Sequence, residues 1–217
     1  MAHPKTTSAS GQQDGGTLSD NRRTIHSYER YARRYAAAVS PQPVGIDEEA
    51  LRRMVDIVQP RGTVLEVGSG PGWDADYVES LGVAVRRTDV TQAFCEFQTE
   101  RGKRIERLDV IEDDLGGLYD AVMALCVLLH IDRDLTDPVL RKVAGALRPE
   151  GVFLVSVREG EGELWETGEV SGEYHVVLWS RDAFVARLAT AGLRVDWSAR
   201  SVDTEGPWWT FLARRLP

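Results

Sequence analysis

Three glycines at alternate positions, preceded by an acid, are the pattern in this chain that most directly suggests chemistry. The glycines are Gly68, Gly70 and Gly72, and Glu66 stands just before them. An apolar, β-branched run precedes the turn and predicts a buried parallel strand, and a helical pattern follows it. This order brings backbone N–H groups close to a ligand at a helix N-terminus, where a Cβ would obstruct the approach. Glu66 could then accept hydrogen bonds from a cationic ligand.

A second acid ends the next predicted strand, 83–88. Asp89 follows the glycine turn by about 20 residues, the spacing at which a carboxylate receives a ribose. A carboxylate accepts two hydrogen bonds and donates none, so it suits a vicinal diol. The alternative is that Asp89 caps the following helix, although Thr91 is also a plausible cap.

One histidine follows the longest apolar strand pattern, 119–127. His130 has an ordinary pKa near neutrality, so it is a candidate catalytic base for a hydroxyl or an amine. The alternative is a histidine that caps or packs the loop. Asp132 and Asp134 come next, but we expect no metal site. Cys126 is expected to be a core cysteine.

Composition limits the class of protein. A chain of 217 residues fits one domain, and the formal charge of −8 argues against a general binder of nucleic acid or membrane surfaces. The two cysteines predict no disulfide framework, and no apolar run is long enough to span a membrane. We therefore expect a cytoplasmic enzyme with a small-molecule substrate, as a monomer or a homodimer.

Strands and helices that alternate along the chain must position these side chains, so we predict an α/β fold. Residues 1–20 are polar and glycine-rich and predict a disordered tail, and 21–217 predict a single domain. The segment 158–178 has little periodicity, and loops at the end of a sheet often carry function. Strands are expected at 63–67, 83–88, 104–108, 119–127, 152–157, 193–199 and 207–214, and helices at 21–39, 47–59, 73–81, 92–101, 137–147 and 180–191.

The first predicted helix has three tyrosines on one face, Tyr28, Tyr31 and Tyr35. An aromatic stripe of this kind usually packs on the core. The alternative is a lid over the active site, formed by the helices of 21–60, and both can hold together.

The glycine spacing separates families of nucleotide-binding proteins. The dinucleotide fingerprint is Gly-x-Gly-x-x-Gly, and a P-loop ends in Gly-Lys-Ser or Gly-Lys-Thr, whereas this turn is Gly-x-Gly-x-Gly. The run 64–72, Val-Leu-Glu-Val-Gly-Ser-Gly-Pro-Gly, closely resembles the first motif of class I S-adenosylmethionine-dependent methyltransferases of the small-molecule type. The resemblance implies a three-layer α/β sandwich. Its seven-stranded sheet is mostly parallel, the last strand is antiparallel, and helices cover both faces.

The resemblance also implies which residues form the site. It implies S-adenosylmethionine as the cofactor and S-adenosylhomocysteine as the product. The residues expected at the cofactor are Glu66, Gly68, Ser69, Gly70, Gly72, Asp89, Val90, Asp109, Val110, Leu125 and Tyr35, with Asp113 or Asp114 as alternatives to Asp109. Those expected at the substrate are Tyr31, Trp73, Arg158, His175 and Trp179. The family resemblance further implies that the segment 158–178 is a substrate-specific insertion.

The implied reaction is in-line transfer of a methyl group to a small-molecule acceptor. An aromatic compound and a natural-product intermediate are both candidates, because tryptophans are frequent in the C-terminal half and at the turn. The alternatives are a protein or RNA methyltransferase, an NAD-binding oxidoreductase, and a non-catalytic nucleotide-binding module.

Overall fold

The computed structural model describes residues 19–59 and 61–217, so nearly all of the predicted tail lies outside the described residues. Two of its residues are described. The Ser19 hydroxyl accepts a hydrogen bond from the N–H of Arg22 and caps a helix that begins at Asp20. The prediction of a tail through Asp20 is wrong for these two residues, because a serine before an amphipathic run is a strong N-cap.

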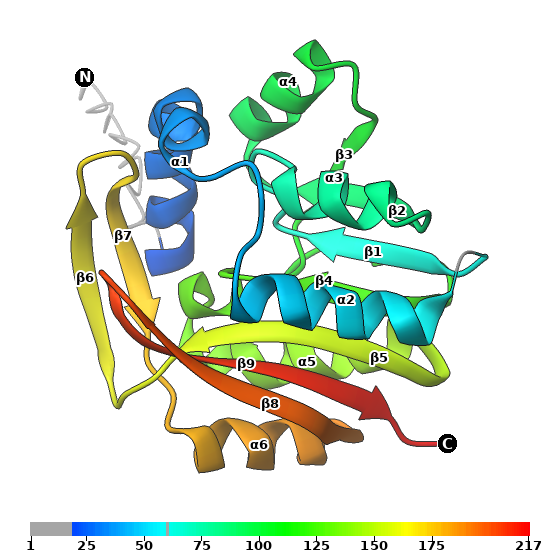
Figure 1. Cartoon of the computed structure of the whole chain (residues 1–217). Coiled ribbons are helices and arrows are strands. Elements are labelled where there is room, and N and C mark those ends of the chain that lie inside the picture. The colour runs from blue at the N-terminus through cyan, green and yellow to red at the C-terminus, as the bar shows by residue number, and fades with distance from the viewer. Residues whose placement is uncertain (1–18, 60) are drawn as a thin grey trace, which may run out of the picture.

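The helices and strands follow the order expected of an α/β fold (Figure 1). Their bounds are α1 (Asp20–Ala38), α2 (Ile46–Val58), β1 (Thr63–Val67), α3 (Trp73–Ser80), β2 (Ala84–Asp89), α4 (Gln92–Glu100), β3 (Ile105–Arg107), β4 (Tyr119–Ala124), the 3-10 helix η1 (Leu128–His130), α5 (Arg133–Ala146), β5 (Leu147–Arg158), β6 (Glu163–Gly168), β7 (Gly172–Val177), α6 (Arg181–Thr190), β8 (Leu193–Asp203) and β9 (Gly206–Arg215).

Seven strands form one sheet in the order β3-β2-β1-β4-β5-β9-β8. The strands from β3 to β5 are parallel, and β9 runs antiparallel to both of its neighbours. The last strand is thus inserted between β5 and β8, and the predicted sheet is confirmed. The strand order reverses at β1, so β2 and β4 lie on opposite sides of it. Parallel sheets bind ligands in the crevice that such a reversal creates.

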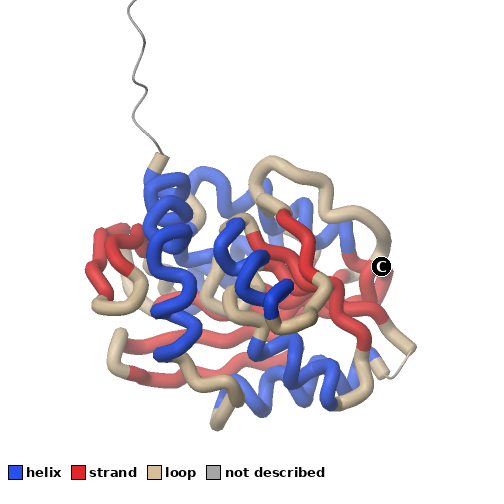
Figure 2. The backbone as a smooth tube through the Cα atoms, turned by 90° about the horizontal axis from the view of Figure 1, so that it is seen from above, coloured by secondary structure: helices blue, strands red, loops and turns tan. Residues whose placement is uncertain are grey.

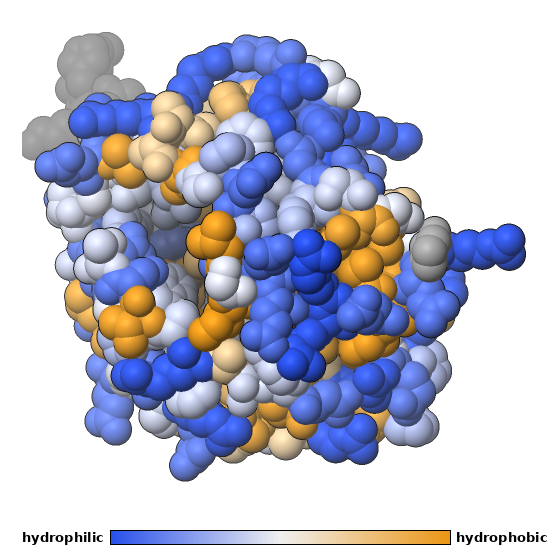
Figure 3. All heavy atoms as spheres, viewed as in Figure 1, coloured by the Kyte–Doolittle hydropathy of each residue, from blue (hydrophilic) through white to orange (hydrophobic). Residues whose placement is uncertain are grey.

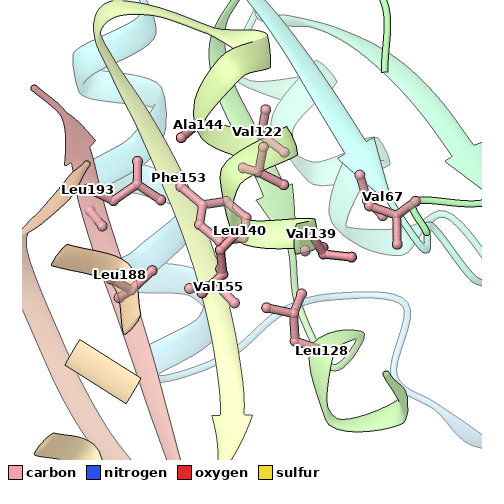
Figure 4. Close-up of a cluster of buried hydrophobic side chains, with 14 of the residues drawn as sticks. Val67, Val122, Leu128, Val139, Leu140, Ala144, Phe153, Val155, Leu188 and Leu193 are labelled. Atoms are coloured by element: carbon pink, nitrogen blue, oxygen red, sulfur yellow. The ribbon is translucent and has the colours of Figure 1, made fainter. Parts of the chain in front are cut away.

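Helices cover both faces of the sheet, as predicted (Figure 2). Leu51 and Met54 of α2 and Val78 of α3 are fully buried against one face. On the other face, side chains of α5 and α6 meet those of the strands, as Figure 4 shows for Leu140, Leu188 and their neighbours. The three-layer arrangement follows from strands that are apolar on both sides.

Several boundaries differ from the sequence prediction. Strand β4 ends at Ala124 and β8 continues to Asp203. Helix α5 begins at Arg133, one turn before the predicted start at Asp137, so Pro138 lies inside the helix, and Asp137 accepts a hydrogen bond from Arg187 of α6 at 2.6 Å.

Strand β5 begins earlier than predicted. Residues 148–151, between the predicted helix and strand, form a shift of register within β5, because Leu147 pairs with Tyr119 and Val152 already pairs with Ala121.

The segment 158–178 forms a β-hairpin of its own, β6 and β7, which packs against α1. The His175 N–H donates to the Thr24 hydroxyl at 2.9 Å, and the Ser27 hydroxyl donates to the Ser171 carbonyl at 3.0 Å. The hairpin therefore supports α1 from outside. In the part of the chain that the structure describes, no helix combines the length and apolar character needed to cross a membrane.

A buried arginine ties the glycine turn to the sheet. The Arg87 guanidinium of β2 donates to the Gly72 carbonyl, to the Gln98 side chain, and to carboxylates of Asp76 and Glu79 on α3. Its side chain is 1% exposed, so these bonds are made away from solvent. Loss of one partner of a buried charge cluster leaves the remaining groups uncompensated.

We therefore expect Arg87→Met to lower the free energy of unfolding by about 3 kcal/mol, measured by urea denaturation. The matched control is Arg33→Met, which removes an exposed ion pair to Glu100 and should leave stability within experimental error. Equal effects of the two changes would contradict the role of the buried cluster.

Candidate active site

A cavity of about 320 Å³ opens where β1, β2 and β4 end, beneath α1. Figure 3 shows the corresponding face hollowed beside the connection from α1 to α2. Its walls come from the glycine turn, the loops after β2, β3 and β4, and α1, which agrees with the position predicted from the strand ends. The sequence-predicted residues that line it are Gly68, Ser69, Gly70, Trp73, Asp89, Val90, Asp109, Val110, Leu125, Tyr35 and His130.

The glycine turn presents only part of its length to the cavity. Gly70 has φ +52°, and a Cβ built on it would meet nothing within 4 Å, so the space beside it is open to a ligand. Gly72 has φ +86°, but its Cβ would lie 2.6 Å from the Gln98 side chain and 2.8 Å from that of Arg87. Gly72 does not line the cavity, and its prediction as a cofactor contact is not supported. It is needed for close packing behind the turn.

Asp89 joins the glycine turn to the start of α4. One carboxylate oxygen accepts the Gly70 N–H at 2.7 Å and the other accepts the Thr91 N–H at 2.7 Å. Burial raises the pKa of Asp89 to about 6, and the two backbone N–H groups oppose that rise. Each oxygen retains a lone pair that a ligand hydroxyl can use, so the loop-bracing role and a binding role are compatible.

Glu66 does not reach the cavity. Its side chain is buried behind the turn, where it accepts a hydrogen bond from the Ser69 hydroxyl, and burial raises the pKa of its carboxyl well above the usual range. The expectation that Glu66 contacts a cationic ligand is not supported. The alternation of side chains along β1 places it beneath the turn it stabilises.

Two acids that the sequence analysis missed take the place expected for Glu66. Asp47 and Asp74 line the cavity, and in the described residues neither makes a side-chain hydrogen bond or an ion pair. Burial, with the nearby Asp47 charge, raises the pKa of Asp74 to about 6. A signal was present in the sequence, because both acids lie in the first turn of helices predicted next to the glycine motif.

The loop after β3 contains three neighbouring acids, which differ in their position relative to the cavity. Asp109 and Val110 line the cavity, whereas Asp113 and Asp114 do not. Asp113 accepts the Asp109 N–H at 2.8 Å, and Asp109 accepts the Ile111 N–H at 2.9 Å. The first acid of the loop therefore points to the ligand space, and the second fixes the loop.

Aromatic side chains of α1 form one wall. The rings of Tyr28 and Tyr35 lie 5.6 Å apart, and each lies about 6 Å from Phe94 of α4. Tyr31 faces the β6–β7 hairpin beside Gly172, outside the cavity, so its expected substrate contact is not supported. A spacing of three residues turns Tyr31 far enough around the helix to face the hairpin, whereas seven returns Tyr35 to the Tyr28 side.

His130 is held in one orientation by two hydrogen bonds. Its Nδ1 lies 2.9 Å from the His175 carbonyl, and its Nε2 lies 3.3 Å from the Tyr28 hydroxyl. A carbonyl can only accept, so Nδ1 carries the proton and Nε2 accepts from Tyr28. Burial lowers the pKa of His130 to about 4, so the imidazole is neutral near pH 7, and its unprotonated Nε2 is bonded to the Tyr28 hydroxyl at the cavity.

Cys126 is exposed to the cavity rather than packed in the core, which corrects the prediction. The chain turns sharply after β4, where Cys126 has φ +55° and its N–H donates to the Ser156 hydroxyl at 2.8 Å. Burial under the cavity walls raises the pKa of the thiol to about 12. The thiol therefore stays protonated and is not a nucleophile near neutral pH.

Three predicted substrate residues lie away from the cavity. Arg158 is buried against Glu166 and Glu205, His175 lies within 4 Å of acids of α1 and β6, and Trp179 packs on Phe184 in the core. No residue of 158–178 lines the cavity in the described chain. Their large or charged side chains suggested a contact with substrate, but in the structure these side chains stabilise the hairpin and the core.

Part of the chain matches a known domain family. Residues 65–153 match the profile of a methyltransferase domain family. No curated protein sequence matches the chain.

Solved structures share the fold over nearly the whole chain. The 1,6-didemethyltoxoflavin-N1-methyltransferase of Burkholderia thailandensis, solved with 1,6-didemethyltoxoflavin and S-adenosylhomocysteine, has a TM-score of 0.68 and 18% identity and covers 94% of this chain and 93% of its own. The magnesium protoporphyrin IX methyltransferase of Synechocystis, solved with S-adenosylmethionine, has a TM-score of 0.73 and 13% identity, covering 93% and 99%. The CcbJ methyltransferase of Streptomyces caelestis has a TM-score of 0.69 and 17% identity, covering 88% and 98%.

The glycine turn allows a direct test of which glycines pack and which face the cavity. Gly70→Ala should cost about 1 kcal/mol of stability, the penalty of a left-handed alanine. Gly72→Ala adds a collision with Gln98 and Arg87, so we expect a loss of about 3 kcal/mol, measured by urea denaturation. A larger loss for Gly70→Ala would contradict the assignment.

Proposed function

Because residues 65–153 match a methyltransferase domain family and the chain has the class I fold, we propose that it transfers the methyl group of S-adenosylmethionine to a small-molecule acceptor. The observation that carries the proposal is the position of Asp89, with both carboxylate oxygens fixed by backbone N–H groups at the edge of the cavity beside Gly70.

The residues of the cavity fit the proposed cofactor. Asp89 would receive the ribose hydroxyls, and Asp109 with Val110 would meet the adenine edge and face. The partnerless Asp74 would receive the ammonium group, and the open space beside Gly70 admits the close approach of a ligand to the turn. When bound, the cofactor supplies a methyl group already activated by the positive sulfur.

The chain's own contribution is position and the handling of one proton. The acceptor atom attacks the methyl carbon in line with the carbon–sulfur bond, whose electron pair stays on sulfur. The neutral Nε2 of His130 can accept a hydrogen bond from an acceptor hydroxyl in place of the Tyr28 hydroxyl. With a pKa near 4, His130 is a weak base, so it takes the proton late, when methylation has made the acceptor acidic.

Two alternatives fit the cavity less well. An RNA substrate needs basic residues near the cleft. The described residues that line the cavity include no lysine or arginine. An NAD-dependent oxidoreductase is disfavoured by the glycine spacing of the turn and by the family match.

Binding of S-adenosylhomocysteine should require the ionised form of Asp89. A carboxyl protonated in the free protein loses part of its accepting capacity, so affinity should fall as the pH drops below about 6, the pKa of both Asp89 and Asp74. Asp89→Asn should weaken binding at pH 8 at least tenfold, measured by calorimetry. Glu96→Gln, an exposed change on α4, is the matched control. Undiminished affinity of a folded Asp89→Asn protein would remove Asp89 from the site.

His130→Ala should lower the turnover number by about a hundredfold and leave the affinity for S-adenosylhomocysteine unchanged. At saturating S-adenosylmethionine, the wild-type turnover number should fall on the acid side near pH 4 and not near 6.5, because burial lowers the pKa of His130. His26→Ala on the exposed side of α1 is the control. Equal turnover for His130→Ala and wild type would exclude a catalytic role.

A further inference from the structure

The described side chains that line the cavity include several acids and no lysine or arginine. The acids are four aspartates, Asp47, Asp74, Asp89 and Asp109. Two of these acids have partners within the loops that they brace, Asp89 at Gly70 and Thr91 and Asp109 at Ile111. Asp47 and Asp74 have none among the described residues.

The two partnerless acids differ in exposure. Asp47 is exposed and lies at the cavity mouth, whereas Asp74 is half-buried beside the glycine turn. Burial raises the pKa of both carboxyls, and the charge of Asp203 adds to the rise at Asp47. Asp203 is occupied, because it accepts the N–H groups of Glu205 and Gly206.

The start of a helix favours an acid, so the presence of Asp47 in α2 and Asp74 in α3 is not evidence of a ligand by itself. The positive end of a helix amounts to about half a charge, however, and a carboxylate exceeds it. Arg158, which contacts the β8–β9 turn at Glu205, is already bound to Glu166 and Glu205. No lysine or arginine of the described lining therefore balances the charge of Asp47.

On the basis of the proposed function, we infer that the methyl acceptor is a small molecule carrying a protonated amine, which binds Asp47 at the cavity mouth while its nucleophile reaches His130. Asp74, which is less exposed, is left for the ammonium group of the cofactor. The rings of Tyr28 and Tyr35 line the cavity beside His130 and suit the apolar body of such a molecule, and aromatic faces also attract cations. An acceptor bearing a carboxylate or a phosphate would meet Asp47 and no lysine or arginine among the described lining residues, so it is rejected.

The test compares matched molecules that differ in charge. The aromatic set is tyramine, para-ethylphenol and para-hydroxyphenylpropionate, and the aliphatic set is hexylamine, hexanol and hexanoate. Each is titrated by calorimetry into the full-length protein saturated with S-adenosylhomocysteine. Saturation is shown first by a thermal shift, so a failure of the proposed function is seen before any acceptor is added and is distinct from a failure of this inference.

We expect the amine of at least one set to bind at least tenfold more tightly than its neutral analogue and the acid to bind more weakly than both. Asp47→Asn should remove the preference for the amine and leave the affinity for the neutral analogue unchanged. Glu49→Gln, which removes a charge paired with Arg53 in the same turn of α2, should keep the preference. Equal binding of amine and acid, absence of binding by both amines, or an unchanged preference in Asp47→Asn would each overturn the inference.

Discussion

The hydrogen bonds of Asp89 are the interaction on which the rest of the site depends. One buried carboxylate holds the N–H of Gly70 with one oxygen and that of Thr91 with the other. The glycine turn after β1 and the loop after β2 are thereby fixed at the same end of the sheet. The side chains of Arg87 and Gln98 also bond the turn, at the Gly72 and Gly70 carbonyls, but they do so from behind it, whereas Asp89 lines the cavity. A ligand that uses the remaining lone pairs meets groups already in place, which lowers the entropy cost of binding.

The electrostatics of the cavity follow from the same constraint. Burial of a carboxylate at the carboxyl ends of the strands costs free energy. The pKa values of Asp89 and Asp74 rise to about 6 because burial disfavours their charged forms. A cationic ligand reverses that cost, since it favours the ionised carboxylates it binds. His130 shows the same effect on a base, a pKa lowered to about 4, which keeps Nε2 unprotonated. Burial thus favours the uncharged form of the acids and of the base alike.

The sequence predicts the sheet and many of the residues that line the cavity, because local patterns determine them. The apolar strands, the glycine spacing and the acid at the end of β2 each depend on a few adjacent residues. The direction in which a side chain points depends on tertiary packing. Glu66 belongs to the motif yet points beneath the turn, and Tyr31 belongs to the tyrosine stripe yet faces the hairpin. Arg158, His175 and Trp179 are fixed by distant partners that the sequence does not pair. For the same reason the exposure of Cys126 to the cavity could not be predicted.

The most direct measurement is a thermal-shift titration of the full-length protein with S-adenosylmethionine, S-adenosylhomocysteine and NAD. A ligand that binds only the folded state stabilises it by about 2.7 kcal/mol at a hundred times its dissociation constant, which is a shift of several degrees. Stabilisation by the two adenosyl compounds and none by NAD is the result that the cavity with Asp89 and Gly70 predicts. A shift with NAD alone, or with none of the three, would contradict the proposed cofactor site.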